Sequence, residues 1–256
     1  MDDVGTRVLR LLDAMPYLHQ AVPGLPEACS ICRGAMKASS HSTYTTCFQC
    51  NSHPHGVFDQ LGFGIYALSG QQSAADMFGY KAENRSLRAE GIVKALTYRA
   101  IHCALSLPGR GFDCVVTVPS LSGRRGRHAL DSITNAALQR IPDPPPLVHL
   151  LEGSNITDSS RRRDVNPAHF HFLGSRQPGN VLLIDDTWTT GGHLTSAAMA
   201  LREAGATGVT AVVLCRWLDP EPTYTGATLF RKSEKLTGPF AEYDFFSGPR
   251  APGGLF

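Results

Sequence analysis

Residues 181–192, with the sequence VLLIDDTWTTGG, decide the predicted fold of this chain. Val181–Ile184 is a continuous apolar run, which is typical of a strand buried on both faces. A polar loop containing glycine follows, and leucine and alanine residues then recur at helical spacing over residues 194–201. Val209–Leu214 is a second apolar strand. The order strand, loop, helix, strand predicts a βαβ unit, a parallel sheet and an α/β fold.

The rest of the chain shows further patterns of secondary structure. Helical periodicity is found at residues 4–15, 87–107 and 127–139, and extended patterns are found at 57–67, 115–118 and 147–151. After Trp217 the chain is polar and rich in Pro and Gly, which indicates either a flap or a disordered tail. We therefore expect four parts: an N-terminal helix (1–24), a four-cysteine segment (25–56), an α/β domain (57–217) and a C-terminal tail (218–256).

Composition and charge exclude several classes of protein. The chain has 256 residues, of which 42% are hydrophobic and 18% charged, and this is typical of a globular protein. Its 24 Lys and Arg against 22 Asp and Glu exclude a polycation but leave room for a local basic patch. No run approaches eighteen apolar residues, so no membrane span is expected. The first residues lack the basic region of a signal peptide, so we expect a cytoplasmic protein.

Four of the seven cysteines form two closely spaced pairs, Cys29 with Cys32 and Cys47 with Cys50. A gap of two residues lets both thiolates of a pair reach one ion, and two such pairs complete a tetrahedron. The segment between the pairs has little to bury, so it needs a metal or disulfides to hold a shape. We expect a structural Zn²⁺ in a small zinc-ribbon-like domain, and a pair of redox dithiols is the alternative.

The loop after the first apolar strand carries the candidate ligand site, because α/β sheets bind ligands at the carboxyl ends of their strands. Asp185 and Asp186 place two carboxylates there, suited to vicinal hydroxyls and to Mg²⁺ held through waters. Residues 189–192 lead into a helix N-terminus, where backbone N–H groups favour a phosphate. This combination describes a site for a ribose 5-phosphate. A helix-capping pair at an ordinary loop is the alternative.

The stretch VLLIDDTWTTGG resembles the phosphoribosyl diphosphate (PRPP) signature of type I phosphoribosyltransferases. With the four-cysteine segment in front, the chain resembles the ComF family over residues 25–217. Weaker matches are FGYKAE, the strand VVTVPS followed by SGRRGRH, and SSRRRDVNPAHFHF. The resemblance implies a type I phosphoribosyltransferase core, in which PRPP loses diphosphate and a nucleophile takes its place. Asp185 and Asp186 would be the catalytic pair. The PRPP-binding residues it implies are Asp185, Asp186, Thr187, Thr189, Thr190, Gly191, Gly192 and His193.

Two basic segments are candidates for further phosphate contacts. Arg124, Arg125 and Arg127 follow another predicted strand end and form the candidate diphosphate loop. The run 161–163 is either a solvated loop or a phosphate contact.

The chain departs from the ComF pattern at three positions. A small residue usually stands at position 193, and aliphatic residues usually stand where this chain has Thr187 and Trp188. The substitution at His193 removes a hydroxyl donor, which a protonated imidazole would replace with charge. Trp188 either stacks on a base beside the site or belongs to the core.

Two functions of different classes follow from this resemblance. The first is an enzyme that binds PRPP and Mg²⁺ and transfers the phosphoribosyl group to an acceptor that the sequence does not identify. The second is a non-catalytic module that senses PRPP or binds nucleic acid. Because ComF family members are associated with DNA uptake in bacteria, its partner would be single-stranded DNA or the DNA-uptake machinery. Similar enzymes are commonly dimers, so the resemblance makes a homodimer possible, but the sequence does not determine the oligomeric state.

Overall fold

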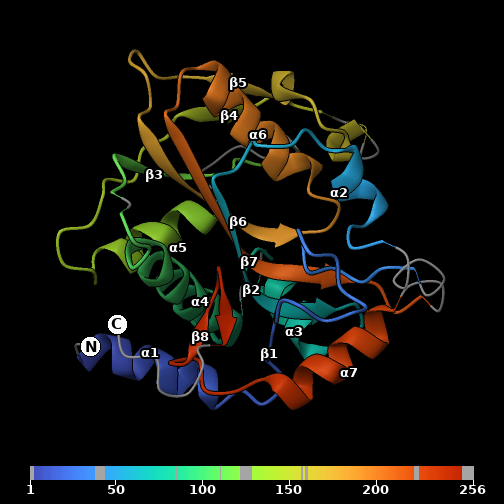
Figure 1. Ribbon diagram of the computed structural model, residues 1–256. Coiled ribbons are helices and arrows are strands. Elements are labelled where there is room, and N and C mark those ends of the chain that lie inside the picture. The colour runs from blue at the N-terminus through green and yellow to red at the C-terminus, as the bar shows by residue number, and fades with distance from the viewer. Residues whose placement is uncertain are drawn as a thin grey trace.

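A mostly parallel sheet forms the centre of the computed structural model (Figure 1). Residues 3–37, 44–82, 84, 86–109, 111–121, 129–156, 158, 161–221 and 225–249 are described. The five strands lie in the order β1-β2-β7-β6-β3, in which β2, β7, β6 and β3 are parallel and β1 is an antiparallel edge strand. Their bounds are His19–Gln20 (β1), Gln60–Leu68 (β2), Cys114–Thr117 (β3), Asn180–Trp188 (β6) and Gly208–Leu218 (β7). The predicted α/β class is therefore confirmed.

Seven helices and two small hairpins surround this sheet in the described part of the chain. The helices are α1 (Asp3–Asp13), α2 (Phe48–Ser52), α3 (Gln72–Gly79), α4 (Leu87–Leu105), α5 (Ala129–Leu138), α6 (Gly192–Glu203) and α7 (Gly226–Leu236). The hairpins pair β4 (Leu151–Gly153) with β5 (Phe170–Phe172) and β8 (Tyr243–Asp244) with β9 (Gly248–Pro249). Two short 3₁₀ helices, η1 (Arg161–Arg163) and η2 (Pro167–His169), precede β5.

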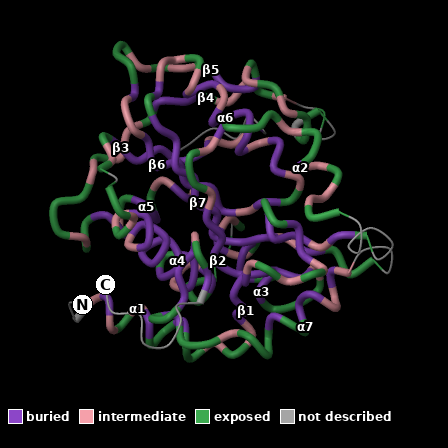
Figure 2. Tube along the Cα trace, in the orientation of Figure 1, coloured by how far each residue is buried: buried purple, intermediate pink, exposed green. Residues whose placement is uncertain are grey.

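The sheet is buried on both faces, as a parallel sheet requires. In β6, Val181 and Leu183 enter one core, while Leu182 and Ile184 enter the other. The first core contains residues of α6, α7 and the cysteine segment, and the second contains residues of α1, α3, α4 and α5. Figure 2 shows buried backbone running through the central strands and exposed backbone on the loops around them. This double burial explains the continuous apolar runs in the sequence.

The predicted βαβ unit is present as β6, α6 and β7, but its first strand is longer than the sequence indicated. The pairing of β6 with β7 continues from Asn180 and Gly208 to Trp188 and Arg216. Asp185 and Asp186 therefore lie inside the strand rather than in the loop after it. The loop itself shortens to residues 189–191.

The C-terminal region is folded onto the rest of the molecule. Helix α7 packs against β1, β2 and β7. Phe240, Tyr243 and Phe245 are fully buried in the second core. Of the two interpretations of this region, disorder is thus wrong for residues 225–249. Residues 250–256 lie outside the described part of the chain. The strand expected at 147–151 is also displaced, because β4 begins at Leu151 and the earlier residues contribute a single bridge to β3.

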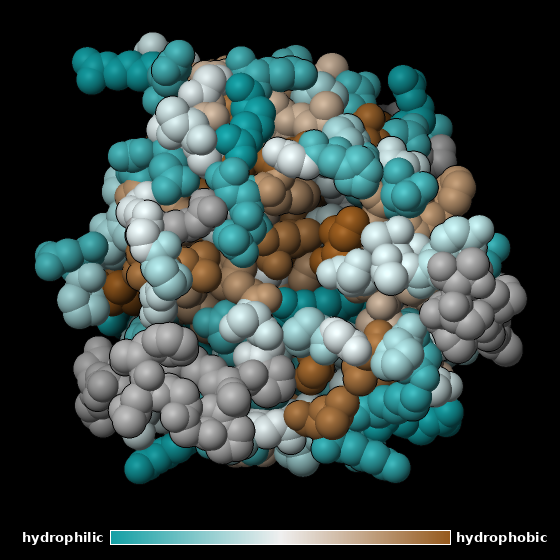
Figure 3. Space-filling view, in the orientation of Figure 1, coloured by the Kyte–Doolittle hydropathy of each residue, from teal (hydrophilic) through white to brown (hydrophobic). Residues whose placement is uncertain are grey.

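The surface shows one feature relevant to ligand binding. Figure 3 shows a hollow near the middle of one face, with apolar residues inside it and hydrophilic residues around it. In the part of the chain that the structure describes, no helix has the length and apolar character needed to cross a membrane.

Candidate functional site

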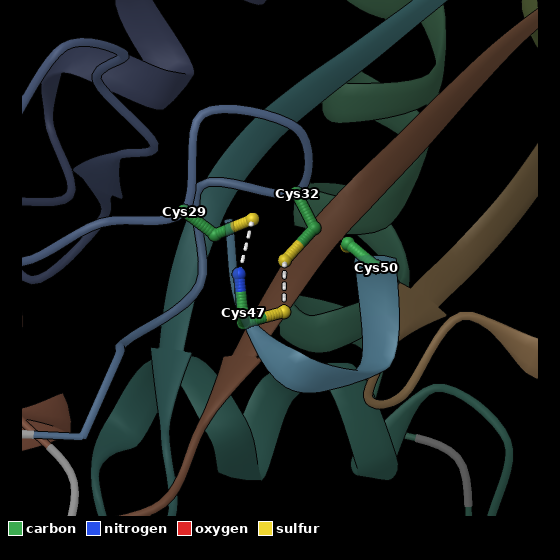
Figure 4. A group of neighbouring side chains, drawn as sticks. All are labelled: Cys29, Cys32, Cys47 and Cys50. Carbon is green, nitrogen blue, oxygen red and sulfur yellow. Dashed lines mark hydrogen bonds between the residues drawn. The ribbon is translucent and has the colours of Figure 1, made fainter. Parts of the chain in front are cut away.

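The four cysteines of the two pairs converge on one point, as predicted. Their sulfur atoms all lie within 4.8 Å of one another (Figure 4). The first pair is held by a tight turn in which the N–H of Arg33 donates to the carbonyl of Cys29 at 2.8 Å. Cys47 directly precedes α2 and Cys50 lies within it, so the short helix brings the second pair to the same place.

This geometry fits a tetrahedral zinc site. A Zn–S distance of about 2.3 Å gives a spacing of about 3.8 Å between sulfurs at the corners of a tetrahedron. The sulfurs of Cys32 and Cys47 are 3.8 Å apart. The pKa of the Cys32 thiol lies well below its usual value because neighbouring thiols and Arg216 stabilise its negative charge. The cluster can therefore hold a metal ion, to which each of the four cysteines offers one sulfur.

The loop between β6 and α6 needs both of its glycines. Gly191 has a φ of +88°, and a Cβ there would lie 2.1 Å from the Trp188 ring. A Cβ on Gly192 would lie 1.9 Å from the carbonyl oxygen of Arg163. The N-cap of α6 is Gly191, which has no side chain to cap the first N–H groups. The positive end of the helix dipole at this N-terminus favours an anion.

Asp185 faces the start of α6. Its carboxylate lies 3.8 Å from Nδ1 of His193 and accepts a hydrogen bond from the N–H of Asp186 at 2.9 Å. The other ring nitrogen of His193, Nε2, is buried without a partner among the described residues. Because an unpaired buried polar atom is costly, this nitrogen is a candidate contact for a ligand. His193 therefore belongs to the same site as Asp185.

Asp186 has different partners, because consecutive side chains of a strand point to opposite faces. The Tyr80 hydroxyl donates to its carboxylate, and the Lys81 ammonium forms an ion pair with it. Burial and the negative charge of Asp186 raise the pKa of Tyr80 well above its usual value, so this phenol stays a donor. The two carboxylates are thus adjacent in the sequence but lie on opposite sides of β6.

Two adjoining cavities lie at this end of the sheet. The smaller cavity, of about 40 Å³, is lined by Asp185, Thr187 and the loop residues 189–191. A larger one of about 300 Å³ extends to Gln49 of the cysteine segment and to Asp219 after β7. Both cavities are lined by Arg163, Thr189 and Thr190. The cysteine segment therefore forms one wall of the space beside the loop.

The other residues singled out in the sequence are either buried in the described structure or lie outside it. Trp188 is 3% exposed and its ring meets that of Phe63 edge-on at 5.5 Å, so it belongs to the core, although it also borders the small cavity. Arg124, Arg125 and Arg127 lie outside the described residues. His169, in the weakly matching stretch SSRRRDVNPAHFHF, is buried in η2.

Sequence reasoning missed several residues of this region. Tyr80 and Lys81 come from FGYKAE, which matched the family weakly but carried no chemistry of its own. Gln49 and Arg216 are single polar residues whose neighbours along the chain indicate nothing. Their roles depend on contacts between segments far apart in the sequence, which no local pattern records.

Comparison of the chain with models of known protein families gives no match, and comparison with curated protein sequences gives none either. The case for a function therefore depends on the geometry of the site.

Proposed function

We propose that this protein is a phosphoribosyltransferase-like protein of the type I fold that binds PRPP with Mg²⁺ at the carboxyl end of β6. The observation that carries the proposal is the succession of a buried acid, Asp185, a glycine loop and an uncapped helix N-terminus in one small cavity. These groups match the hydroxyls and the 5-phosphate of a ribose 5-phosphate unit.

In this proposal, different residues of the site bind different parts of the ligand. Asp185 accepts hydrogen bonds from the ribose hydroxyls, and Nε2 of His193 donates to the ligand. The N–H groups of residues 189–193 hold the 5-phosphate. Arg163 lines both cavities and suits the diphosphate. The 300 Å³ cavity leaves space for the acceptor.

Catalysis in this proposal needs positioning and charge rather than a covalent intermediate. The bond from the anomeric carbon to the diphosphate breaks as the bond to the acceptor forms, and the site stabilises the positive charge on the sugar. Mg²⁺ would neutralise the leaving diphosphate. Asp186 already pairs with Lys81, so the ion would arrive with PRPP and be held through waters.

Calorimetric titration with PRPP and Mg²⁺ tests this proposal. We expect binding by the native protein and a loss of at least about tenfold in affinity for Asp185→Asn, because a charge-assisted hydrogen bond contributes about 1.5–3 kcal/mol. Asp244→Asn is the matched control, since Asp244 is equally buried but lies in the β8–β9 hairpin. An unchanged affinity in Asp185→Asn, or no binding by the native protein, would refute the proposal.

One observation favours the second function, a nucleic-acid-binding module. A cavity of about 500 Å³ on the cysteine segment is lined by Lys37 and by two exposed aromatic side chains, Tyr44 and Phe48. Exposed aromatics beside a cation are typical of surfaces on which bases stack. Binding of labelled single-stranded DNA that weakens with salt and is lost in Tyr44→Ala/Phe48→Ala would support this function. Absence of binding at low salt would exclude it.

A further inference from the structure

Arg216 joins the cysteine cluster to the strand end that carries the ligand loop. It lies on β7 directly opposite Trp188 of β6 and is 8% exposed. Its Nε donates to the carbonyl of Cys32 at 3.0 Å, and its Nη2 donates to the Cys32 sulfur at 3.5 Å. Its Nη1 donates to the carbonyl of Trp188 at 3.0 Å and also reaches the carbonyl of Trp217. Trp188 is the residue immediately before the loop.

The counter-charge of this guanidinium comes from the cysteine cluster. A buried cation is costly unless it is paired, and the hydrogen-bond partners of Arg216 are carbonyl oxygens and one sulfur. Four thiolates around Zn²⁺ carry a net charge of about −2. Loss of the metal would free the Cys32 sulfur to move, and the guanidinium that donates to it would lose a fixed partner.

The turn that begins at Cys29 and closes at Gly34 packs closely against the guanidinium. A Cβ on Gly34 would lie 1.8 Å from Nη2 of Arg216, so a larger residue would displace it. The neighbouring Arg33 is also buried but has other partners. It donates to the carbonyls of Ala21 and Phe246 and to the Tyr243 hydroxyl. The two arginines thus connect the cysteine segment to different parts of the molecule: Arg216 to the ends of β6 and β7, and Arg33 to the C-terminal hairpin.

We propose that Arg216 is a positioning residue through which the four-cysteine site sets the geometry of the loop, so that metal and sugar phosphate bind cooperatively. The inference rests on the proposed function of the loop. The metal-bound thiolate of Cys32 orients the guanidinium, and the guanidinium in turn fixes the carbonyl of Trp188 where the loop begins. Binding at either site then favours the arrangement that the other site needs.

Reciprocal binding measurements on the full chain test this coupling. The probe is ribose 5-phosphate, which offers the hydroxyls and the phosphate without the chelating diphosphate. Zinc affinity is measured by competition with a chromophoric chelator, with and without saturating ribose 5-phosphate. Linkage requires that the sugar phosphate raise zinc affinity by the factor by which zinc raises sugar-phosphate affinity. We expect a factor of about five or more in the native protein.

Two variants, each with a matched control, separate a positioning role from a general loss of stability. Arg216→Met should reduce the factor to about one, whereas Arg33→Met, which removes an equally buried arginine, should leave it unchanged. Gly34→Ala keeps every hydrogen-bonding group and should weaken the coupling by displacing the guanidinium. Its control is Gly238→Ala, where an added Cβ meets no atom within 4 Å.

The outcomes distinguish this inference from the proposed function. Native protein that binds ribose 5-phosphate but shows the same zinc affinity with and without it overturns the coupling and leaves the proposed function intact. Equal loss of coupling in Arg33→Met and Arg216→Met also overturns it, because any damage to the segment would then suffice. Native protein that does not bind ribose 5-phosphate overturns both.

Discussion

The parallel sheet and the cysteine segment meet along β7, but different forces hold them. The sheet buries aliphatic side chains on both faces, among them Leu182 and Leu183, which are 0% exposed. The segment from Cys29 to Cys50 contributes little beyond its sulfurs and Met36 to the core. Its ordered contacts are centred on four cysteines that can hold a metal ion and on two buried arginines, Arg33 and Arg216. Stability in the sheet is thus spread over many contacts, whereas in the segment it is concentrated in a few.

Removal of one metal ligand should have the largest effect, because structural zinc sites bind with about 10–16 kcal/mol of apparent free energy. We expect Cys50→Ser to lose nearly all zinc after dialysis against a chelator, while the native protein keeps one zinc per chain. Metal content by atomic emission measures this. Cys103→Ser is the control, since Cys103 is buried in α4 away from the cluster. Full zinc content in Cys50→Ser would contradict the four-ligand site.

A deletion in the sheet should have a smaller effect of a different kind. We expect Leu183→Ala to lower the free energy of unfolding by about 2–5 kcal/mol, because it leaves a cavity in a fully buried layer. Zinc content under native conditions should stay unchanged. Urea denaturation measures the change, and Leu87→Ala, the same substitution at a residue 85% exposed, is the control. Release of zinc by folded Leu183→Ala would show that the two regions are not separately stabilised.

The same contrast explains which parts of the molecule could be predicted from its sequence. The cysteine cluster was predictable because ligand chemistry demands fixed residue types at fixed spacing. The βαβ unit was predictable because burial on both faces leaves an uninterrupted apolar run. The position at which β6 ends was not predictable from the sequence, since carboxylates rarely continue a buried strand. Asp185 and Asp186 do so because His193, Tyr80 and Lys81 provide partners from other elements.

The C-terminal region was misjudged for a related reason. Pro and Gly indicated a flap or disorder, yet the segment GPFAEYDFF places three aromatic rings in the core. These rings pack in a core that also contains residues of β2 and α4, so the fit exists only in three dimensions. The spacing of Phe240, Tyr243 and Phe245 was the available signal. Arg216 offered no such signal, because a single arginine at a strand end looks like any solvated residue.

The smallest predicted effect is a pH dependence at the edge of the sheet, away from the four-cysteine cluster. His19 of β1 is 5% exposed, its Nδ1 lies 3.2 Å from the carbonyl of Phe230, and its ring lies 4.2 Å from that of Phe230. Burial lowers its pKa below the usual value of 6.5. Below about pH 6.5 the unfolded chain therefore takes up a proton that the folded chain resists, so stability falls as the pH decreases.

From the value of 6.5 in the unfolded chain, the loss at pH 6 is at most about 1 kcal/mol. Urea denaturation at pH 8 and pH 6 should show this loss in the native protein and a smaller one in His19→Asn, whose amide can still donate to Phe230. Zinc content is followed at both values, because protonation of the cysteines would otherwise mimic the effect. If zinc is retained and both proteins lose the same stability, the pH dependence arises outside β1. Acid would then act first on the cysteine segment. The difference between the sheet, whose stability is spread over many contacts, and the segment, whose stability depends on a few groups, would then be larger still.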